Sequence, residues 1–183
     1  MKKTVLVPVA NGFEEIEAMT IIDVLRRAGC DVTIASVQKK EVTASHGVKI
    51  IADCIISDCE DNEYDLIALP GGIPGSTNLK NSKTLEKMLN QQKQKNKKYA
   101  AICAAPAVVL QAFGLLENKK ATCYPSFTDE LSSYSNEATV ITDGICITSQ
   151  GAGTAMDFAF ALVESLFDSD KANELKASML VRY

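Results

Sequence analysis

The chain has 183 residues, of which 46% are hydrophobic and 23% are charged, and this composition is typical of a compact globular protein with a buried core. We expect one domain that spans residues 1–183. The formal net charge of −4 at pH 7 gives no basic surface for nucleic acid or anionic lipid, so we expect neither nucleic acid nor a membrane as a partner.

The amino-terminal segment and the cysteines indicate the compartment. The apolar run from Val5 to Ala10 is too short for a signal-peptide core, and no segment has the length of a membrane span. The six cysteines lack the CxxC spacing of zinc sites and the chain has one histidine, so we expect no metal. We therefore expect reduced thiols in a cytoplasmic protein.

The first half of the chain alternates strand and helix patterns. Residues 4–10 are continuously apolar, as in a parallel strand buried on both faces. Residues 14–28 carry apolar side chains at three- and four-residue spacing, with Met19 and Ile22 off this stripe, and Gly29 supplies a helix stop. The other elements predicted here are a strand at 32–37, a hairpin at 42–52 that turns at His46-Gly47, and a strand at 65–69 closed by Pro70-Gly71-Gly72.

The second half continues the alternation. It predicts a helix at 85–94, a strand at 99–102, a short helix at 105–113, paired strands at 139–141 and 145–148, and a long apolar helix at 152–167. This order favours an α/β fold with a mostly parallel sheet covered by helices on both faces. Ligands then bind at the carboxyl ends of the strands, where the Gly71-Gly72 turn and Cys103 lie.

Cys103 follows a predicted buried strand and precedes a predicted helix. The residues on both sides of it are small, so the backbone can turn sharply and project the thiol into the crevice. A thiol at a helix amino terminus also meets the positive end of the helix dipole, which favours the nucleophilic thiolate. The alternative is one more buried core cysteine, as we expect for the other five.

Two neighbouring segments supply candidate partners for Cys103. Gly71 and Gly72 lack Cβ atoms, so their amides and that of Ala104 could surround an oxyanion, although Pro-Gly-Gly alone is an ordinary turn signal. Glu14, Glu15 and Glu17 lie at the start of the first helix, where solvated acids are common. Glu17 differs because core residues follow it at helical spacing, so we expect a desolvated carboxyl with a raised pKa beside the thiol.

Together these segments resemble the ThiJ/PfpI superfamily, and within it the branch that contains the parkinsonism-associated deglycase. The resemblance is carried, in order, by residues 11–17, 23–29, 69–72, 101–106 and 148–154. It implies a flavodoxin-like three-layer sandwich and a homodimer, with Cys103 as nucleophile and Glu17 as its protonated hydrogen-bond partner. It also implies an anion site formed by the amides of Gly71, Gly72 and Ala104.

The resemblance further implies cofactor-free chemistry on reactive carbonyls or glycated amines and thiols, with methylglyoxal converted to lactate. A redox-sensing chaperone that uses Cys103 oxidation without turnover is the alternative. The human member of the branch has a histidine before a proline near the nucleophile, whereas this chain has Tyr124 before Pro125. We take Tyr124, Pro125 and Glu14 as possible pocket residues. Ala104, where peptidase-like members carry a histidine, makes a peptidase the weaker option.

Overall fold

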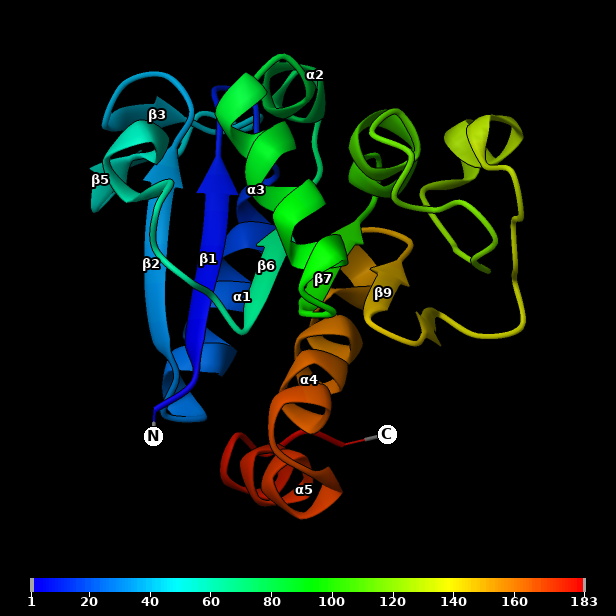
Figure 1. The fold of residues 1–183 in the computed structure, drawn as a ribbon. Coiled ribbons are helices and arrows are strands. Elements are labelled where there is room, and N and C mark those ends of the chain that lie inside the picture. The colour runs from blue at the N-terminus through cyan, green and yellow to red at the C-terminus, as the bar shows by residue number, and fades with distance from the viewer. Residues whose placement is uncertain (1, 183) are drawn as a thin grey trace.

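The structure is a computed structural model and describes residues 2–182. Its centre is a seven-stranded sheet in the order β5-β2-β1-β6-β7-β9-β8 (Figure 1). Each neighbouring pair is parallel except β8 with β9, which confirms the predicted mostly parallel sheet. The strands are β1 (Thr4–Val9), β2 (Asp31–Ser36), β5 (Cys54–Ile55), β6 (Leu66–Leu69), β7 (Lys98–Ile102), β8 (Val140–Asp143) and β9 (Cys146–Ser149).

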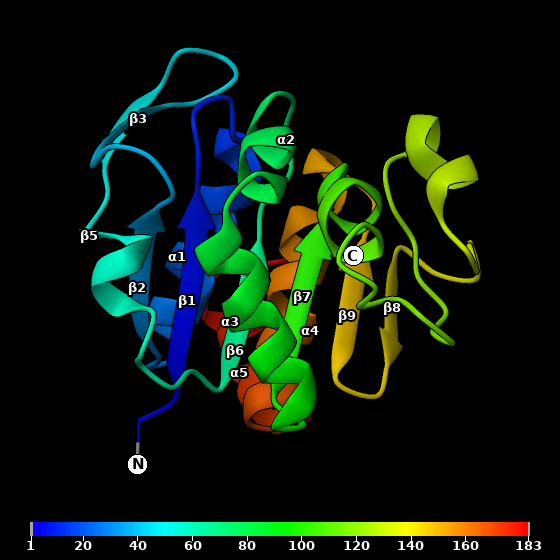
Figure 2. The same cartoon turned by 45° about the horizontal axis from the view of Figure 1, so that its top comes forward.

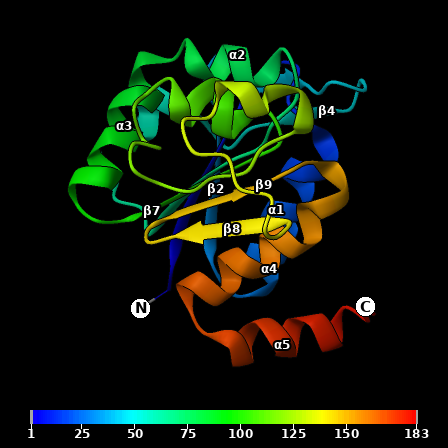
Figure 3. The same cartoon turned by 90° about the vertical axis from the view of Figure 1, so that its right-hand side faces the viewer.

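Helices cover both faces of the sheet, so the fold is the expected three-layer sandwich (Figure 3). Successive strand residues point to opposite faces: Val5 and Val7 pack in one core with α1, α4 and α5, whereas Leu6 packs in the other with α2 and α3. The helices are α1 (Glu15–Arg27), α2 (Gly75–Lys80), α3 (Lys83–Gln94), α4 (Ala155–Leu166) and α5 (Ser169–Ser178).

Some elements differ from the sequence prediction. The helix expected at 105–113 is a π-helix at Pro106–Gln111, and the long helix at 152–167 is a 3₁₀ turn at Ala152–Thr154 followed by α4. We predicted neither α2 nor α5. The first is six residues long, and the second buries Ala172 and Leu175 among mostly polar residues, so neither gives a strong helical pattern.

The predicted hairpin is confirmed, and it lies beside the carboxyl end of β1 (Figure 2). Its strands are β3 (Glu41–Thr43) and β4 (Lys49–Ile51), and Gly47 has φ +91° in the turn, where glycine is favoured. The N–H of Gly12 donates to the carbonyl of Thr43 over 2.8 Å, so the hairpin is bonded to the segment that enters α1. Within residues 2–182, no helix combines the length and apolar content needed to cross a bilayer.

The core face of α1 is wider than the sequence pattern suggested. We expected Met19 and Ile22 to lie off the core stripe, but Ile22 is buried in the same core as Ile21, and Met19 is partly buried against it. The large apolar residue of α1 that remains exposed is Ile16, with 56% of its surface accessible. A helix packed between a sheet and α4 buries more than one stripe, which explains the difference.

We propose that a second copy of the chain covers two exposed apolar side chains, Ile16 of α1 and Ile51 of the hairpin. Light scattering at micromolar concentration should give twice the mass of one chain. Ile16→Gln should shift the population toward monomer, whereas Leu180→Gln, at an exposed apolar residue outside these elements, should not. A monomeric wild type would contradict the proposal.

Candidate functional site

Cys103 occupies a sharp turn directly after β7. Its φ is +64°, a left-handed conformation that non-glycine residues adopt rarely and that recurs at functional sites. The backbone is fixed on both sides, because the N–H of Cys103 donates to the carbonyl of Ser149 over 3.0 Å and its carbonyl accepts from the N–H of Tyr124 over 2.8 Å. The turn expected between strand and helix is therefore present, and the thiol on it is half-buried.

Backbone amides surround the thiol and the carboxyl separately. The N–H groups of Gly72 and Ala104 face the Cys103 sulfur and lower its pKa, against the larger effects that raise it. The N–H of Gly71 donates instead to Oε2 of Glu17 over 2.7 Å. The structure thus gives Gly71 a different acceptor from the one expected, and the amides that face the sulfur are those of Gly72 and Ala104.

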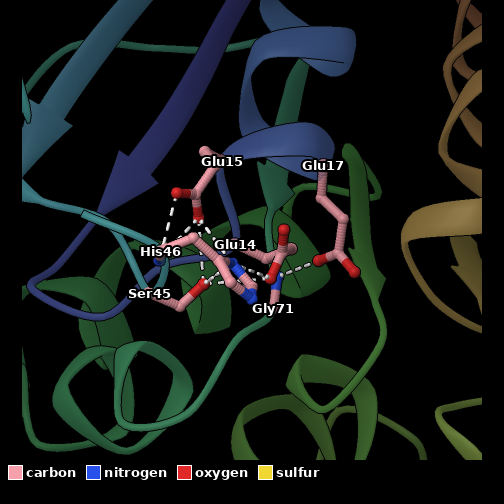
Figure 4. A network of polar contacts seen from close by, with 6 residues as sticks. All are labelled: Glu14, Glu15, Glu17, Ser45, His46 and Gly71. Carbon is pink, nitrogen blue, oxygen red and sulfur yellow. Dashed lines mark hydrogen bonds and ion pairs between the residues drawn. The ribbon is translucent and has the colours of Figure 1, made fainter. Parts of the chain in front are cut away.

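Glu17 and Cys103 lie close together against Gly71, and their side chains interact with each other. The Glu17 side chain is completely buried, and its Oε1 has no hydrogen-bond partner among the described residues. A Cβ atom on Gly71 would lie 2.6 Å from Cys103 Cβ and 2.9 Å from Glu17 Oε2, distances that real Cβ atoms do not tolerate. The site is therefore built around a position where only hydrogen fits, and Figure 4 shows the Glu17 carboxyl turned toward it.

Glu17 and Cys103 influence each other's pKa. Burial raises the pKa of Glu17 to about 7, as the sequence predicts, although the hydrogen bond from Gly71 opposes the shift. Burial, together with the negative charge of Glu17, raises the pKa of the Cys103 thiol to about 12. The pair therefore loses one proton near neutrality and holds the second strongly.

The predicted direction for Cys103 is thus wrong. We expected the helix dipole to lower the pKa of Cys103 and leave the thiol substantially ionised beside a protonated Glu17. The element that follows is a six-residue π-helix, whose dipole is too weak to offset burial beside a carboxyl group.

Glu14 and Glu15 are not the solvated first-turn acids that we expected. Glu15 is 9% exposed, and hydrogen bonds from its own backbone N–H, Ser45 and His46 overcome the cost of burial and lower its pKa to about 2. The carboxylate of Glu14 accepts from Ser45 Oγ over 3.0 Å, and its N–H donates to the carbonyl of Gly71. We did not predict that the hairpin residues Ser45 and His46 bind these carboxylates, because the partners lie about 30 residues apart in the sequence.

Tyr124 and Pro125, the other pocket candidates, are exposed, and so is His46. Tyr124 touches the site through its backbone, while its side chain is exposed and its ring lies near Gly151, where an added Cβ would be 3.4 Å from Cδ2. Pro125 is exposed. His46 is exposed on the hairpin turn, as expected, but its ring Nδ1 lies 3.2 Å from Glu15.

Glu14, Glu15 and His46 present possible metal ligands within 4.8 Å of one another. The two carboxylates already accept hydrogen bonds from Ser45, and Glu15 also accepts from the His46 backbone. These internal bonds account for the cluster, and we assign it no ion.

Comparison with protein families decides the relationship: residues 3–165 match the DJ-1/PfpI family. The chain belongs to this family. Protein DJ-1 homolog B of Arabidopsis thaliana is 49% identical over 98% of this chain. This match covers 42% of the plant protein, so the chain spans less than half the length of that relative.

Two further members of the DJ-1/PfpI family match along most of their length. The glutathione-independent glyoxalase DJR-1.2 of Caenorhabditis elegans is 34% identical over 88% of this chain and 87% of its own. The solved structure of oxidized Toxoplasma gondii DJ-1 is 44% identical, with a TM-score of 0.96, and covers 99% of this chain and 100% of its own. The α/β sandwich is therefore that of DJ-1 proteins.

Gly71→Ala should disrupt the site, because the new methyl group would collide with Cys103 and Glu17. We expect the rate of Cys103 alkylation by iodoacetamide to change severalfold and the melting temperature to fall. Gly153→Ala is the matched control, since a Cβ there meets nothing within 4 Å. Equal behaviour of the two variants would show that the site tolerates a side chain at position 71.

Glu17 should make stability fall with rising pH. Its pKa is about 7 in the folded state and 4.5 in its ordinary state, so the folded protein binds more protons between these values. Ionising the buried carboxyl then costs of the order of 3 kcal/mol above neutrality. In urea unfolding at several pH values, Glu17→Gln should lack this decline and the exposed-site variant Glu164→Gln should keep it; a decline unchanged in Glu17→Gln would refute the assignment.

Proposed function

We propose that the chain is a cysteine-dependent, cofactor-free enzyme that acts on small reactive carbonyls, as a glyoxalase that converts methylglyoxal to lactate or as a deglycase. The observation that carries the proposal is the placement of Cys103 and Glu17 close together against Gly71, with the amides of Gly72 and Ala104 at the sulfur. A nucleophile, an acid/base and hydrogen-bond donors are thus within one site. The name of the Caenorhabditis elegans relative supports the glyoxalase activity.

The first step is attack of the Cys103 sulfur on the aldehyde, with Glu17 as the base. Because Glu17 has a pKa of about 7, a substantial fraction is carboxylate at neutral pH and can accept the thiol proton as sulfur attacks the aldehyde carbon. A carbon–sulfur bond forms and the carbonyl electron pair moves to oxygen. The amides of Gly72 and Ala104 then stabilise the negative oxygen, which takes a proton to give a hemithioacetal.

The second stage moves a proton between neighbouring carbons. Glu17 removes the proton from the carbon bonded to sulfur, giving an enediol, and returns it to the adjacent carbon, which leaves a thioester of lactate. Water then cleaves the carbon–sulfur bond and restores the thiol. The sum is methylglyoxal plus water to lactic acid, so no external oxidant or reductant is needed. A deglycase would use the same attack on a glyoxal-derived adduct.

A redox sensor that uses the same residues is the second candidate. Oxygens added to the Cys103 sulfur would meet the amides of Gly72 and Ala104, and a protonated Glu17 could donate to them. The similar Toxoplasma gondii structure is described as oxidized, which is a statement about that protein. In this reading the raised pKa of Glu17 serves to hold an oxidised sulfur, and turnover is absent.

Lactate formation from methylglyoxal should separate the two functions. Reduced wild type should turn over with a rate that rises through about pH 7, because the carboxylate form of Glu17 is the base. Cys103→Ser and Glu17→Gln should each lose roughly a hundredfold or more. Cys54→Ser, at another partly buried cysteine, is the control and should retain activity.

The enzyme must be free of contaminating glyoxalase, which the Cys103→Ser preparation tests directly. A wild type without turnover, but with Cys103 oxidised by peroxide to a stable sulfinic acid, would favour the sensor and contradict the enzyme.

A further inference from the structure

We propose that Glu15 is a positioning residue whose buried carboxylate fastens the β3–β4 hairpin to the first turn of α1 and thereby holds Glu17 against Gly71. The inference rests on the proposed pairing of Glu17 with Cys103. It gives the hairpin a role in the site through residues 11–15, to which its hydrogen bonds are made.

Glu15 is the centre of a dense set of contacts. Its two oxygens accept from the backbone N–H of His46 over 3.0 and 3.2 Å, and Oε2 also accepts from Ser45 Oγ over 2.9 Å. The His46 ring adds a contact at 3.2 Å. Charge-assisted bonds of this kind are about twice as strong as neutral ones, so a buried carboxylate with several donors is a firm anchor.

The hairpin also holds the segment before α1. The N–H of Ser45 donates to the carbonyl of Phe13 over 2.8 Å, and that of Thr43 donates to Asn11 Oδ1 over 3.0 Å. These contacts and those of Glu15 lie along one stretch of chain. The hairpin therefore fixes residues 11–15 as a unit.

The same stretch of chain also contacts the turn that carries Gly71 and Gly72. The N–H of Gly75 donates to the carbonyl of Gly12, and the N–H of Glu14 donates to the carbonyl of Gly71, each over 3.0 Å. A Cβ on Gly72 would lie 2.6 Å from both Glu14 N and Gly12 O, so the two backbones touch. Contacts thus run without a break from the hairpin, through residues 11–15, to the amides that face Cys103.

The two acids of this helical turn face opposite partners. Figure 4 shows Glu15 turned toward Ser45 and His46, and Glu17 turned toward Gly71. Donors from the hairpin hold the pKa of Glu15 at about 2, whereas burial with one backbone donor raises that of Glu17 to about 7. The charge of Glu15 is therefore satisfied outside the reaction site, and the proton stays with Glu17.

Release of the anchor has a defined electrostatic consequence. The ionisable groups that face Glu17 are Cys103, from the turn after β7, and Glu14, whose negative charge raises the pKa of Glu17. If the turn loosens, water reaches Glu17 and its pKa falls toward 4.5, while its distance from the sulfur varies. A purely structural role for Glu15 would lower stability without this titration effect.

The test is the pH dependence of Cys103 alkylation by iodoacetamide in the full chain, with peptide mass mapping to confirm the site. Wild type should show a midpoint near pH 7. Glu15→Ala should lower that midpoint by about one pH unit or more and slow the reaction about tenfold at pH 7. Glu15→Gln, which keeps an acceptor for the His46 N–H, should show a smaller change of the same kind.

Glu41→Gln is the matched control, because Glu41 lies on the same hairpin but is exposed and pairs with Lys49 at 3.6 Å. A folded Glu15→Ala with the wild-type profile would overturn the proposal. If Glu15→Ala does not fold, Ser45→Ala removes one donor and should lower the midpoint by a smaller amount; an unchanged profile there would overturn the proposal equally.

Alkylation needs no substrate, so absence of methylglyoxal turnover would overturn the proposed enzyme activity and leave this test intact. A wild-type profile without a neutral midpoint would instead overturn the pairing of Glu17 with Cys103, and with it the role of Glu15.

Discussion

The burial of the Glu17 carboxyl is the constraint on which the site depends. A completely buried carboxyl favours its protonated form, and the structure offsets that cost through a single backbone donor, the N–H of Gly71. The consequence is an acid that exchanges its proton near neutrality beside a thiol. Had Glu17 been as well supplied with donors as Glu15, it would be a fixed anion with no proton to give.

The fold supplies this arrangement from four separate parts of the chain. Helix α1 carries Glu17, the turn after β6 carries Gly71 and Gly72, and the turn after β7 carries Cys103. Because β1, β6 and β7 are parallel neighbours, their carboxyl ends meet at one edge of the sheet. The β3–β4 hairpin closes the set by binding the segment between β1 and α1. Small changes in any of these parts alter the distance between one carboxyl and one sulfur.

Sequence patterns predicted the parts that depend on local order. The buried strands, the turn at Cys103 and the burial of Glu17 follow from apolar runs, small residues and helical spacing. The partner of the Gly71 amide could not be predicted, because it depends on where Glu17 sits in three dimensions. The same holds for Glu15, whose donors come from a distant turn and reverse the pKa shift that burial alone would cause. The ionisation of Cys103 was mispredicted because local geometry suggested a helix dipole, whereas burial and a neighbouring charge dominate.

The central claim is that Glu17 exchanges its proton near neutral pH, and infrared difference spectroscopy tests it most directly. The protonated-carboxyl stretching band that distinguishes wild type from Glu17→Gln should be present in weak acid and disappear with a midpoint near pH 7. A band already lost by about pH 5.5, as for an ordinary glutamate, would contradict the account.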